Sequence, residues 1–350
     1  MNPILIFLSL ILVGWKTSDA LNLPPIFPAI LIFGDSAVDT GNNNYIPTMV
    51  KSNHSPYGQD FPNGTATGRF SNGLLVPDLL ASSFGIKEFV PPYFDPSLSD
   101  NELPTGVSFA SAGSGLDELS AKTSGALSMP VQISLFKNYK EDLVNVVGKE
   151  EASKIVSGAF VMIDAGGNDI LFNFYDTQAR RRSQFNITEY HNFLLQKQKS
   201  LVKELYDLGC RIFGVSGVAP LGCIPFQITR KNSKGRRCLE AENAETQMYN
   251  SKLKNMTQIL QETLLGSSIA YLDNYNPMMD MINNQQKYGF VETNRGCCGT
   301  GLTEIGPFCN ATTPVCSNPS EYLFWDAVHP SEAVYKSIAK TIYRELLETN

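Results

Sequence analysis

The chain has few histidines and no excess of positive charge. Its 350 residues include only three His, and 28 Lys and Arg stand against 34 Asp and Glu, giving a formal net charge of −6. Proteins that bind nucleic acid through its phosphates carry a basic surface, and no basic stripe runs along this sequence. The composition therefore argues against nucleic-acid and anionic-membrane partners. It also limits the candidates for a catalytic base to three residues.

Motifs of cofactor-dependent enzymes are missing. The sequence contains no phosphate-binding Gly-rich loop with Lys, no dinucleotide fingerprint and no His-Glu-x-x-His. It also lacks the Gly-x-Ser-x-Gly elbow of ordinary α/β-hydrolases. We therefore expect neither a cofactor nor a bound metal. Nothing in the sequence predicts an obligate protein partner.

Long hydrophobic runs are confined to the first twenty residues. The run from Ile4 to Val13 is too short to span a bilayer, and small residues follow it up to Ala20. This pattern predicts a signal peptide at 1–20, with a short membrane anchor or a buried helix as the alternatives. The remainder, 21–350, is expected to form one secreted domain without a stable membrane anchor.

Two further features agree with secretion. The first is a set of Asn-x-Ser/Thr glycosylation acceptors, at Asn53, Asn63, Asn186, Asn255 and Asn310. The second is a set of disulfide candidates, comprising Cys223, Cys238, Cys297, Cys298, Cys309 and Cys316. Adjacent Cys297 and Cys298 lack the spacing of a zinc ribbon, and the pairing within the cluster from 297 to 316 stays open. Cys210 is left over, and we interpret it as a buried thiol at the entry to a strand.

Short apolar runs alternate with longer amphipathic segments. Strands are predicted at 29–33, 158–164, 211–218 and 268–273, and the clearest helices at 188–208, 238–265 and 331–347. Parallel strands need a helix's length of chain between them, so this alternation predicts an α/β fold, a three-layer α/β/α sandwich with a mainly parallel sheet. Ligands of such sheets bind beyond the carboxyl ends of the strands. Ser36 and Asn168 follow the first two strands closely.

The histidines differ in their surroundings. His54 lies in a polar loop, and His191 lies near the start of a long amphipathic helix, where we expect it to be solvated. Asp326 precedes His329 by three residues, which puts both side chains on one side of a turn, so that the carboxylate can bind Nδ1–H and leave Nε2 free. His329 is therefore the candidate base, although an Asp-x-x-His pair is often structural.

Ser36 is the candidate nucleophile, because serine becomes reactive when an imidazole oriented by a carboxylate takes its proton. A helix N-cap is the alternative role for a Ser in this position. Donors for an oxyanion can come from the small-residue stretch around Gly113 and from the Asn168 amide. A glycine turn and an Asx-turn are their structural alternatives.

Several blocks together resemble a known family. FGDSAVDTGNNN (33–44), GVSFASAGSG (106–115), GGND (166–169) and DAVH (326–329) occur in the order of the motif blocks of plant GDSL esterases/lipases, in the SGNH hydrolase superfamily. GRFSNG (68–73), GVAPLGCIP (217–225) and CCGTG (297–301) extend the similarity over nearly the whole mature chain. The sequence departs from the family's usual motifs at Ser108, Ala165 and Gly167. These departures affect how a substrate would fit and remove no catalytic group.

The resemblance implies specific roles. Ser36 would attack an ester carbonyl, His329 would act as base and then acid, and Asp326 would orient His329. The N–H groups of Ser36 and Gly113, with the Asn168 side chain, would hold the oxyanion. The expected function is therefore a secreted esterase/lipase acting on small-molecule or lipid esters. An extracellular transacylase and a non-catalytic binding or defence protein are the alternatives.

Overall fold

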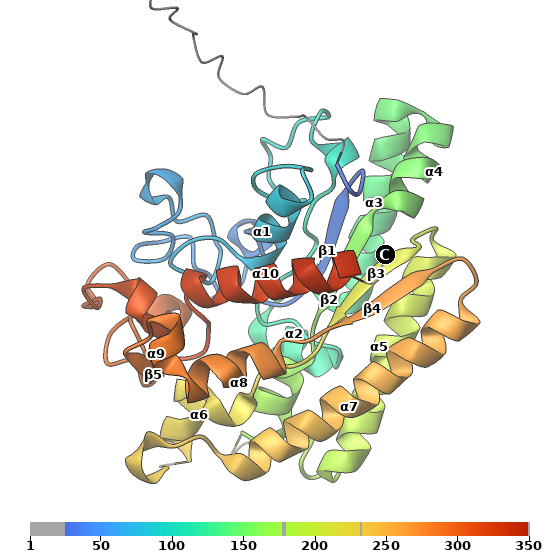
Figure 1. Ribbon diagram of the computed structural model, residues 1–350. Helices are drawn as coiled ribbons and strands as arrows, with labels where there is room; N and C mark the ends of the chain where they lie inside the picture. The colour runs from blue at the N-terminus through green and yellow to red at the C-terminus, as the bar shows by residue number, and fades with distance from the viewer. Residues whose placement is uncertain (1–24, 177–179, 232, 349–350) are drawn as a thin grey trace, which may run out of the picture.

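The computed structural model describes residues 25–176, 180–231 and 233–348 (Figure 1). The predicted signal peptide at 1–20 lies outside the described residues. Within the described residues, no helix is both long enough and apolar enough to cross a membrane.

A parallel sheet forms the centre of the molecule. Within the described part of the chain it has four strands in the order β1-β2-β3-β4, namely β1 (Ile30–Gly34), β2 (Phe160–Asp164), β3 (Ile212–Ser216) and β4 (Ser268–Leu272). All the residues of β1 are buried, as the continuous apolar runs of the sequence predict for strands covered on both faces. The predicted strands are confirmed, and each end lies within two residues of its predicted position.

Helices cover both faces of this sheet (Figure 1). One layer contains α1 (Val76–Ser83), α8 (Tyr275–Asn283) and α10 (Glu332–Glu348), and α10 packs against the other two. The other layer contains α3 (Met129–Val147), α4 (Lys149–Gly158), α5 (Ile187–Asp207) and α7 (Glu240–Thr263). Right-handed crossovers between successive neighbouring strands place these connecting helices on one face of the sheet. The expected three-layer fold is therefore confirmed. The shorter helices are α2 (Glu118–Ser124), α6 (Pro225–Arg230) and α9 (Gln285–Tyr288).

The outer edge of β1 is occupied by the segment 107–111. Ile32 N donates to Val107 O at 3.1 Å, and Phe109 N donates back to Ile32 O at 2.8 Å. Gly106 precedes this segment with φ +89°, and a Cβ there would lie 1.9 Å from Ile30 O. The close approach requires glycine, and it brings the small-residue stretch 106–115 alongside the end of β1.

A smaller sheet carries the C-terminal motif. Strand β5 (Glu292–Gly296) pairs in parallel with β6 (Tyr322–Phe324), directly before Asp326. Disulfides Cys297–Cys316 and Cys298–Cys309 lie beside it, and Cys223–Cys238 closes a separate loop. The predicted cysteines therefore form disulfides, with a pairing that spacing alone left open.

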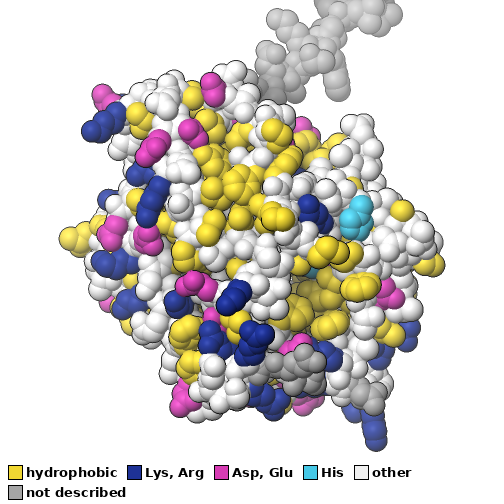
Figure 2. All heavy atoms as spheres, turned by 180° about the vertical axis from the view of Figure 1, so that it is seen from behind, with side chains coloured by type: hydrophobic (Ala, Val, Ile, Leu, Met, Phe, Trp, Pro, Cys, Tyr) yellow, Lys and Arg dark blue, Asp and Glu magenta, His cyan; other side chains and the backbone are white. Residues whose placement is uncertain are grey.

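On the rear face, hydrophobic side chains gather in hollows with charged side chains around them (Figure 2).

Candidate active site

Ser36 lies in the turn that follows β1. Gly34 leaves the strand with φ +149°, and a Cβ at this position would lie 2.2 Å from the carbonyl oxygen of Asp164 on β2. Only glycine fits here, so the chain can turn at the carboxyl edge of the sheet. No helix of the described residues begins at Ser36, so the N-cap interpretation is wrong. The side chain of Ser36 is instead directed to His329.

The three predicted catalytic side chains form a hydrogen-bonded chain. His329 Nε2 lies 2.8 Å from Ser36 Oγ, and His329 Nδ1 lies 2.8 Å from Asp326 Oδ2. A carboxylate only accepts hydrogen bonds, so Nδ1 carries the proton and Nε2 accepts from the serine hydroxyl. The N–H groups of Val328 and His329 donate to Asp326 Oδ1 at 2.8 and 2.7 Å. These two backbone hydrogen bonds therefore fix the orientation of the Asp326 carboxylate that contacts the imidazole.

Tyr57 is a further member of this network, and no sequence motif indicates it. Its hydroxyl donates to Asp326 Oδ2 at 2.6 Å and accepts from Gly306 N at 2.8 Å. Burial and the neighbouring Asp326 raise the pKa of Tyr57 well above its usual value, so the phenol stays protonated and able to donate. On the other side, the ring of Phe70 packs 4.8 Å from the ring of His329. No short motif connects these residues, which lie far apart in sequence.

Gly113 and Asn168 lie at the same site as Ser36. Both contribute, with Ser36 and His329, to the wall of one groove. Asn168 Nδ2 donates one hydrogen to Ser114 O at 2.8 Å, which orients the amide and leaves its second hydrogen for another acceptor. Gly113 adopts φ +85°, and a Cβ there would lie 2.6 Å from Cβ of Ser124. Only glycine therefore fits at position 113.

Asp39 of the first motif block holds the second block in place. Its carboxylate accepts from Ala112 N at 2.9 Å and from the N–H groups of Gly41 and Asn42, each at 2.8 Å. Burial raises the pKa of Asp39 to about 6, although these backbone N–H groups act in the opposite direction. Because Ala112 directly precedes Gly113, this contact fixes the backbone at the candidate oxyanion donor.

Two cavities meet at Ser36. The larger is a groove of about 530 Å³, and the smaller is a cavity of about 120 Å³. Ser36, Asn168, Val328 and His329 line both, so a substrate bound at the serine hydroxyl has space on two sides. Among the aromatic residues that follow β2 and β6, Phe172 lines the groove, whereas Phe174 and Trp325 are buried.

Two buried carboxyl groups line the small cavity. Burial and the nearby Asp164 raise the pKa of Asp35 well above its usual value, and burial raises the pKa of Asp164 to about 6. Asn274 Nδ2 donates to Asp164 at 3.1 Å. The hydroxyl of Tyr335, also in this wall, has no hydrogen-bond partner among the described residues. One wall of this cavity is therefore polar, and the others are aliphatic.

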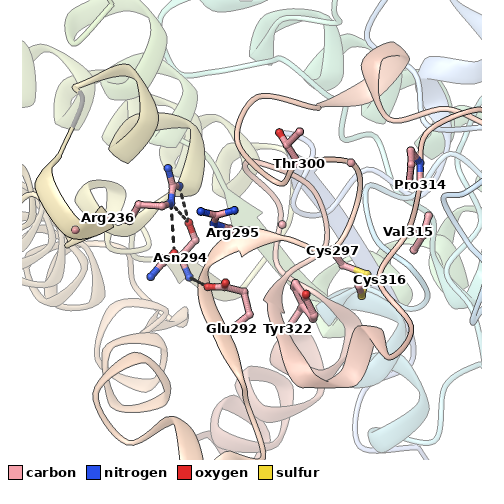
Figure 3. A pocket seen from close by; sticks show the side chains of 13 residues that line it. Arg236, Glu292, Asn294, Arg295, Cys297, Thr300, Pro314, Val315, Cys316 and Tyr322 are labelled. Carbon is pink, nitrogen blue, oxygen red and sulfur yellow. Dashed lines mark hydrogen bonds between the residues drawn. A yellow bond between two sulfur atoms is a disulfide. The ribbon is translucent and has the colours of Figure 1, made fainter.

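A hollow larger than both of these cavities lies elsewhere. It measures about 850 Å³ and lies between the loop after α6 and the small sheet. Figure 3 shows Arg236 and Arg295 on one side of it and the Cys297–Cys316 disulfide on the other. Arg236 is engaged there by Asn294, whose backbone oxygen accepts at 2.6 Å. None of the residues that line this hollow is a Ser or His, so size alone does not identify the reactive site.

Comparisons with known proteins agree with this geometry. Residues 30–342 match the family model described as GDSL-like Lipase/Acylhydrolase. The chain belongs to the GDSL esterase/lipase family. It is 48% identical over 323 residues to GDSL esterase/lipase At1g06990 of Arabidopsis thaliana, spanning 92% of this chain and 89% of that protein. A second relative from the same plant, GDSL esterase/lipase At2g24560, is 48% identical over 332 residues, with 94% and 92% covered.

Membership makes this GDSL esterase/lipase an enzyme of the carboxylic ester hydrolase class. All the motif blocks quoted from the sequence except CCGTG (297–301) contribute residues to the cavities at Ser36. GRFSNG contributes Arg69, whose buried guanidinium pairs with Asp78 at 2.7 Å, and Phe70, which contacts the histidine ring. Ring contacts and a buried ion pair therefore help to hold these family motifs together.

The other two histidines do not reach this site. His54 contacts backbone oxygens of its own loop. His191 was expected to be solvated, and this is wrong: it is 1% exposed, faces α7 and packs against Tyr249. Neither of its ring nitrogens has a hydrogen-bond partner among the described residues, and burial lowers its pKa to about 4. The remaining cysteine of this GDSL esterase/lipase, Cys210, is buried as predicted.

Proposed function

We propose that this protein is a secreted serine esterase/lipase that hydrolyses carboxylic esters through an acyl-serine intermediate. The observation that carries the proposal is the continuous hydrogen-bonded chain from Ser36 Oγ through His329 to Asp326, with 2.8 Å at each step. Its position at the junction of two cavities gives an ester access to the serine.

In the first half of the reaction, Ser36 Oγ attacks the carbonyl carbon of the ester while His329 Nε2 takes the hydroxyl proton. The charge that develops on the carbonyl oxygen is stabilised by the N–H groups of Ser36 and Gly113 and by the Asn168 amide. Collapse of this intermediate breaks the bond to the alcohol, which receives the proton from His329. The acyl group stays on Ser36.

In the second half, His329 takes a proton from water as the water oxygen attacks the acyl carbon. The bond to Ser36 Oγ then breaks, and the proton returns to the serine. Asp326 holds Nδ1–H in both halves and stabilises the imidazolium that forms each time. The residues, the ester and water supply every proton and electron pair, so the proposal includes no cofactor and no metal.

Secretion is part of the same proposal. The Cys223–Cys238, Cys297–Cys316 and Cys298–Cys309 disulfides suit an oxidising compartment. Four of the five glycosylation acceptors have exposed side chains, and the fifth, Asn310, is partly exposed. We propose cleavage after Ala20 and one domain spanning 21–350. Mass spectrometry of the secreted protein tests the new N-terminus and the glycan at each acceptor.

Hydrolysis of p-nitrophenyl esters by the secreted protein, by Ser36→Ala and by His329→Ala tests the reaction. We expect turnover by the wild type and a loss of at least a thousandfold in each variant. Adding a small alcohol separates hydrolysis from transfer, because a transacylase gives mainly the new ester as product. Absence of turnover by a folded wild-type protein on every chain length would contradict the proposal and favour a binding role.

A further inference from the structure

The two cavities that meet at Ser36 differ in volume and in the exposure of the residues that line them. We propose that this difference selects the substrate, with the acyl group of the ester in the small cavity and its alcohol in the groove. The inference rests on the serine mechanism proposed above and adds a substrate class to it. That class is the esters of short, uncharged acids with bulky, apolar alcohols.

The small cavity limits the length of the acyl group. Its volume is about 120 Å³. The groove measures about 530 Å³, so the small cavity offers less than a quarter of that space. Aliphatic side chains of Val38, Leu171, Val218 and Ile338 form much of its wall. The small cavity therefore favours a short acyl chain such as acetyl or butanoyl over a long one such as octanoyl.

Exposure assigns the two halves of the ester. No residue that lines the small cavity is exposed, whereas Met49 and Phe308 at the groove are 79% and 73% exposed. In the proposed mechanism the alcohol leaves while the acyl group is still bonded to Ser36, and water then enters. We therefore assign the departing alcohol to the groove with exposed residues at its rim, and the acyl group to the cavity lined only by buried and partly buried residues.

The residues in the walls of the two cavities limit which acyl groups and which alcohols can bind. Asp35 and Asp164 line the small cavity, and burial raises the pKa of both carboxyl groups, so the same environment disfavours an acyl group with a terminal carboxylate. In the groove, the rings of Phe172 and Phe226 lie 5.9 Å apart, and Phe308 lies at the rim. Aromatic walls of this kind bury apolar surface of a bulky alcohol.

Two positions allow the small cavity to be filled. A Cβ on Gly167 would meet no atom within 4 Å, and its backbone is not in the left-handed region. Ala219 lines the cavity independently of Gly167. Gly167→Leu and Ala219→Leu therefore add volume from two separate positions. Ala241→Leu, on the exposed part of α7, is the matched control for added side-chain volume.

The experiment measures kcat/KM for p-nitrophenyl acetate, butanoate and octanoate. We expect butanoate to exceed octanoate by at least tenfold in the wild type and in Ala241→Leu, because excess methylenes in a closed pocket cost roughly tenfold or more. Both filling variants should lower the butanoate-to-acetate ratio by about tenfold. Thr123→Trp, at the exposed rim of the groove, should raise KM for 2-naphthyl acetate and leave that ratio unchanged.

Two results would overturn the assignment while leaving the proposed function intact. One is turnover that is equal on all chain lengths or best on octanoate. The other is an acyl-length ratio that changes in Thr123→Trp but not in Gly167→Leu or Ala219→Leu, which would place the acyl group in the groove. Absence of any turnover, together with a Ser36 that does not react with a fluorophosphonate, would overturn both proposals.

Discussion

Tyr57 donates a 2.6 Å hydrogen bond to Oδ2 of Asp326, the same oxygen that His329 Nδ1 meets at 2.8 Å. The Asp326 side chain is fully buried, so this carboxylate depends on such donors in place of water. Tyr57 does not line either cavity at Ser36. We therefore expect Tyr57 to act on the reaction by positioning Asp326 rather than by contacting the substrate.

Tyr57→Phe therefore tests positioning without removing a triad member. Loss of one hydrogen bond to a buried charged group corresponds to about tenfold in rate. We expect kcat to fall by about this factor with KM unchanged, because the substrate contacts are intact. Steady-state kinetics on a short-chain ester provide the measurement. A rise in KM at constant kcat would instead assign Tyr57 to substrate binding.

Asn168→Ala removes one proposed oxyanion donor. Loss of such a donor typically lowers kcat by roughly a hundred- to a thousandfold. We predict a loss of this size with a change of less than about threefold in KM. Asn138→Ala, an exposed Asn on α3, is the matched control and should behave as the wild type. Equal activities of the two variants would show that Asn168 is only structural.

The buried pair Arg69–Asp78 should dominate local stability. Its partners are 4% and 0% exposed, and Asp78 also accepts from the N–H groups of Leu75 and Val90. Arg69→Leu leaves a buried carboxylate without its cation, which typically costs about 3–5 kcal/mol. Denaturant unfolding measures this loss in the free energy of unfolding.

Lys137–Glu204 supplies the control for that measurement. Its partners are 50% and 49% exposed, so Lys137→Met should cost no more than about 1 kcal/mol. Similar losses in the two variants would mean that the Arg69 pair contributes little beyond an ordinary surface contact.

His191 predicts acid sensitivity of the fold. Its pKa is about 4 in the folded chain against an ordinary value of 6.5, so the unfolded chain binds its proton more readily between these values. The stability that the fold has while His191 is neutral is fully present above pH 6.5 and is lost as the pH falls toward 4. At pH 5 the loss is about 2 kcal/mol relative to neutral pH, since one pKa unit corresponds to about 1.4 kcal/mol.

His191→Phe keeps a ring against Tyr249 on α7 and removes the titration; Lys252 is the nearby charge that acts in the same direction as burial. Urea unfolding at pH 7 and pH 5 should show a drop that is about 2 kcal/mol smaller in the variant. An identical drop in both proteins would contradict the assignment of this sensitivity to His191.

Periodicity and motif order predicted much of this molecule. Strand β2 was located by its apolar run, because burial on both faces leaves a continuous signal. Ser36, Asp326 and His329 could be found because each follows a strand or lies in a short motif. Their mutual distances could not be predicted, because Ser36 follows β1 of the central sheet and His329 follows β6 of the separate small sheet.

Other features depend on packing that no local pattern records. The face of α5 that carries His191 is covered by α7, so a residue that looks solvated is buried. Tyr57 reaches Asp326 across 269 positions of sequence. The pairing of Cys297 with Cys316 depends on the loop beside β5 and β6, which cysteine spacing does not specify.

Covalent labelling of Ser36 tests the central claim most directly. A fluorophosphonate should phosphonylate the Ser36 hydroxyl with release of fluoride, and peptide mapping should find one adduct per chain on the peptide that contains Ser36. Ser36→Ala should give no adduct, and His329→Ala should react at least a hundredfold more slowly. An adduct at another residue, or an unchanged rate in His329→Ala, would contradict the account.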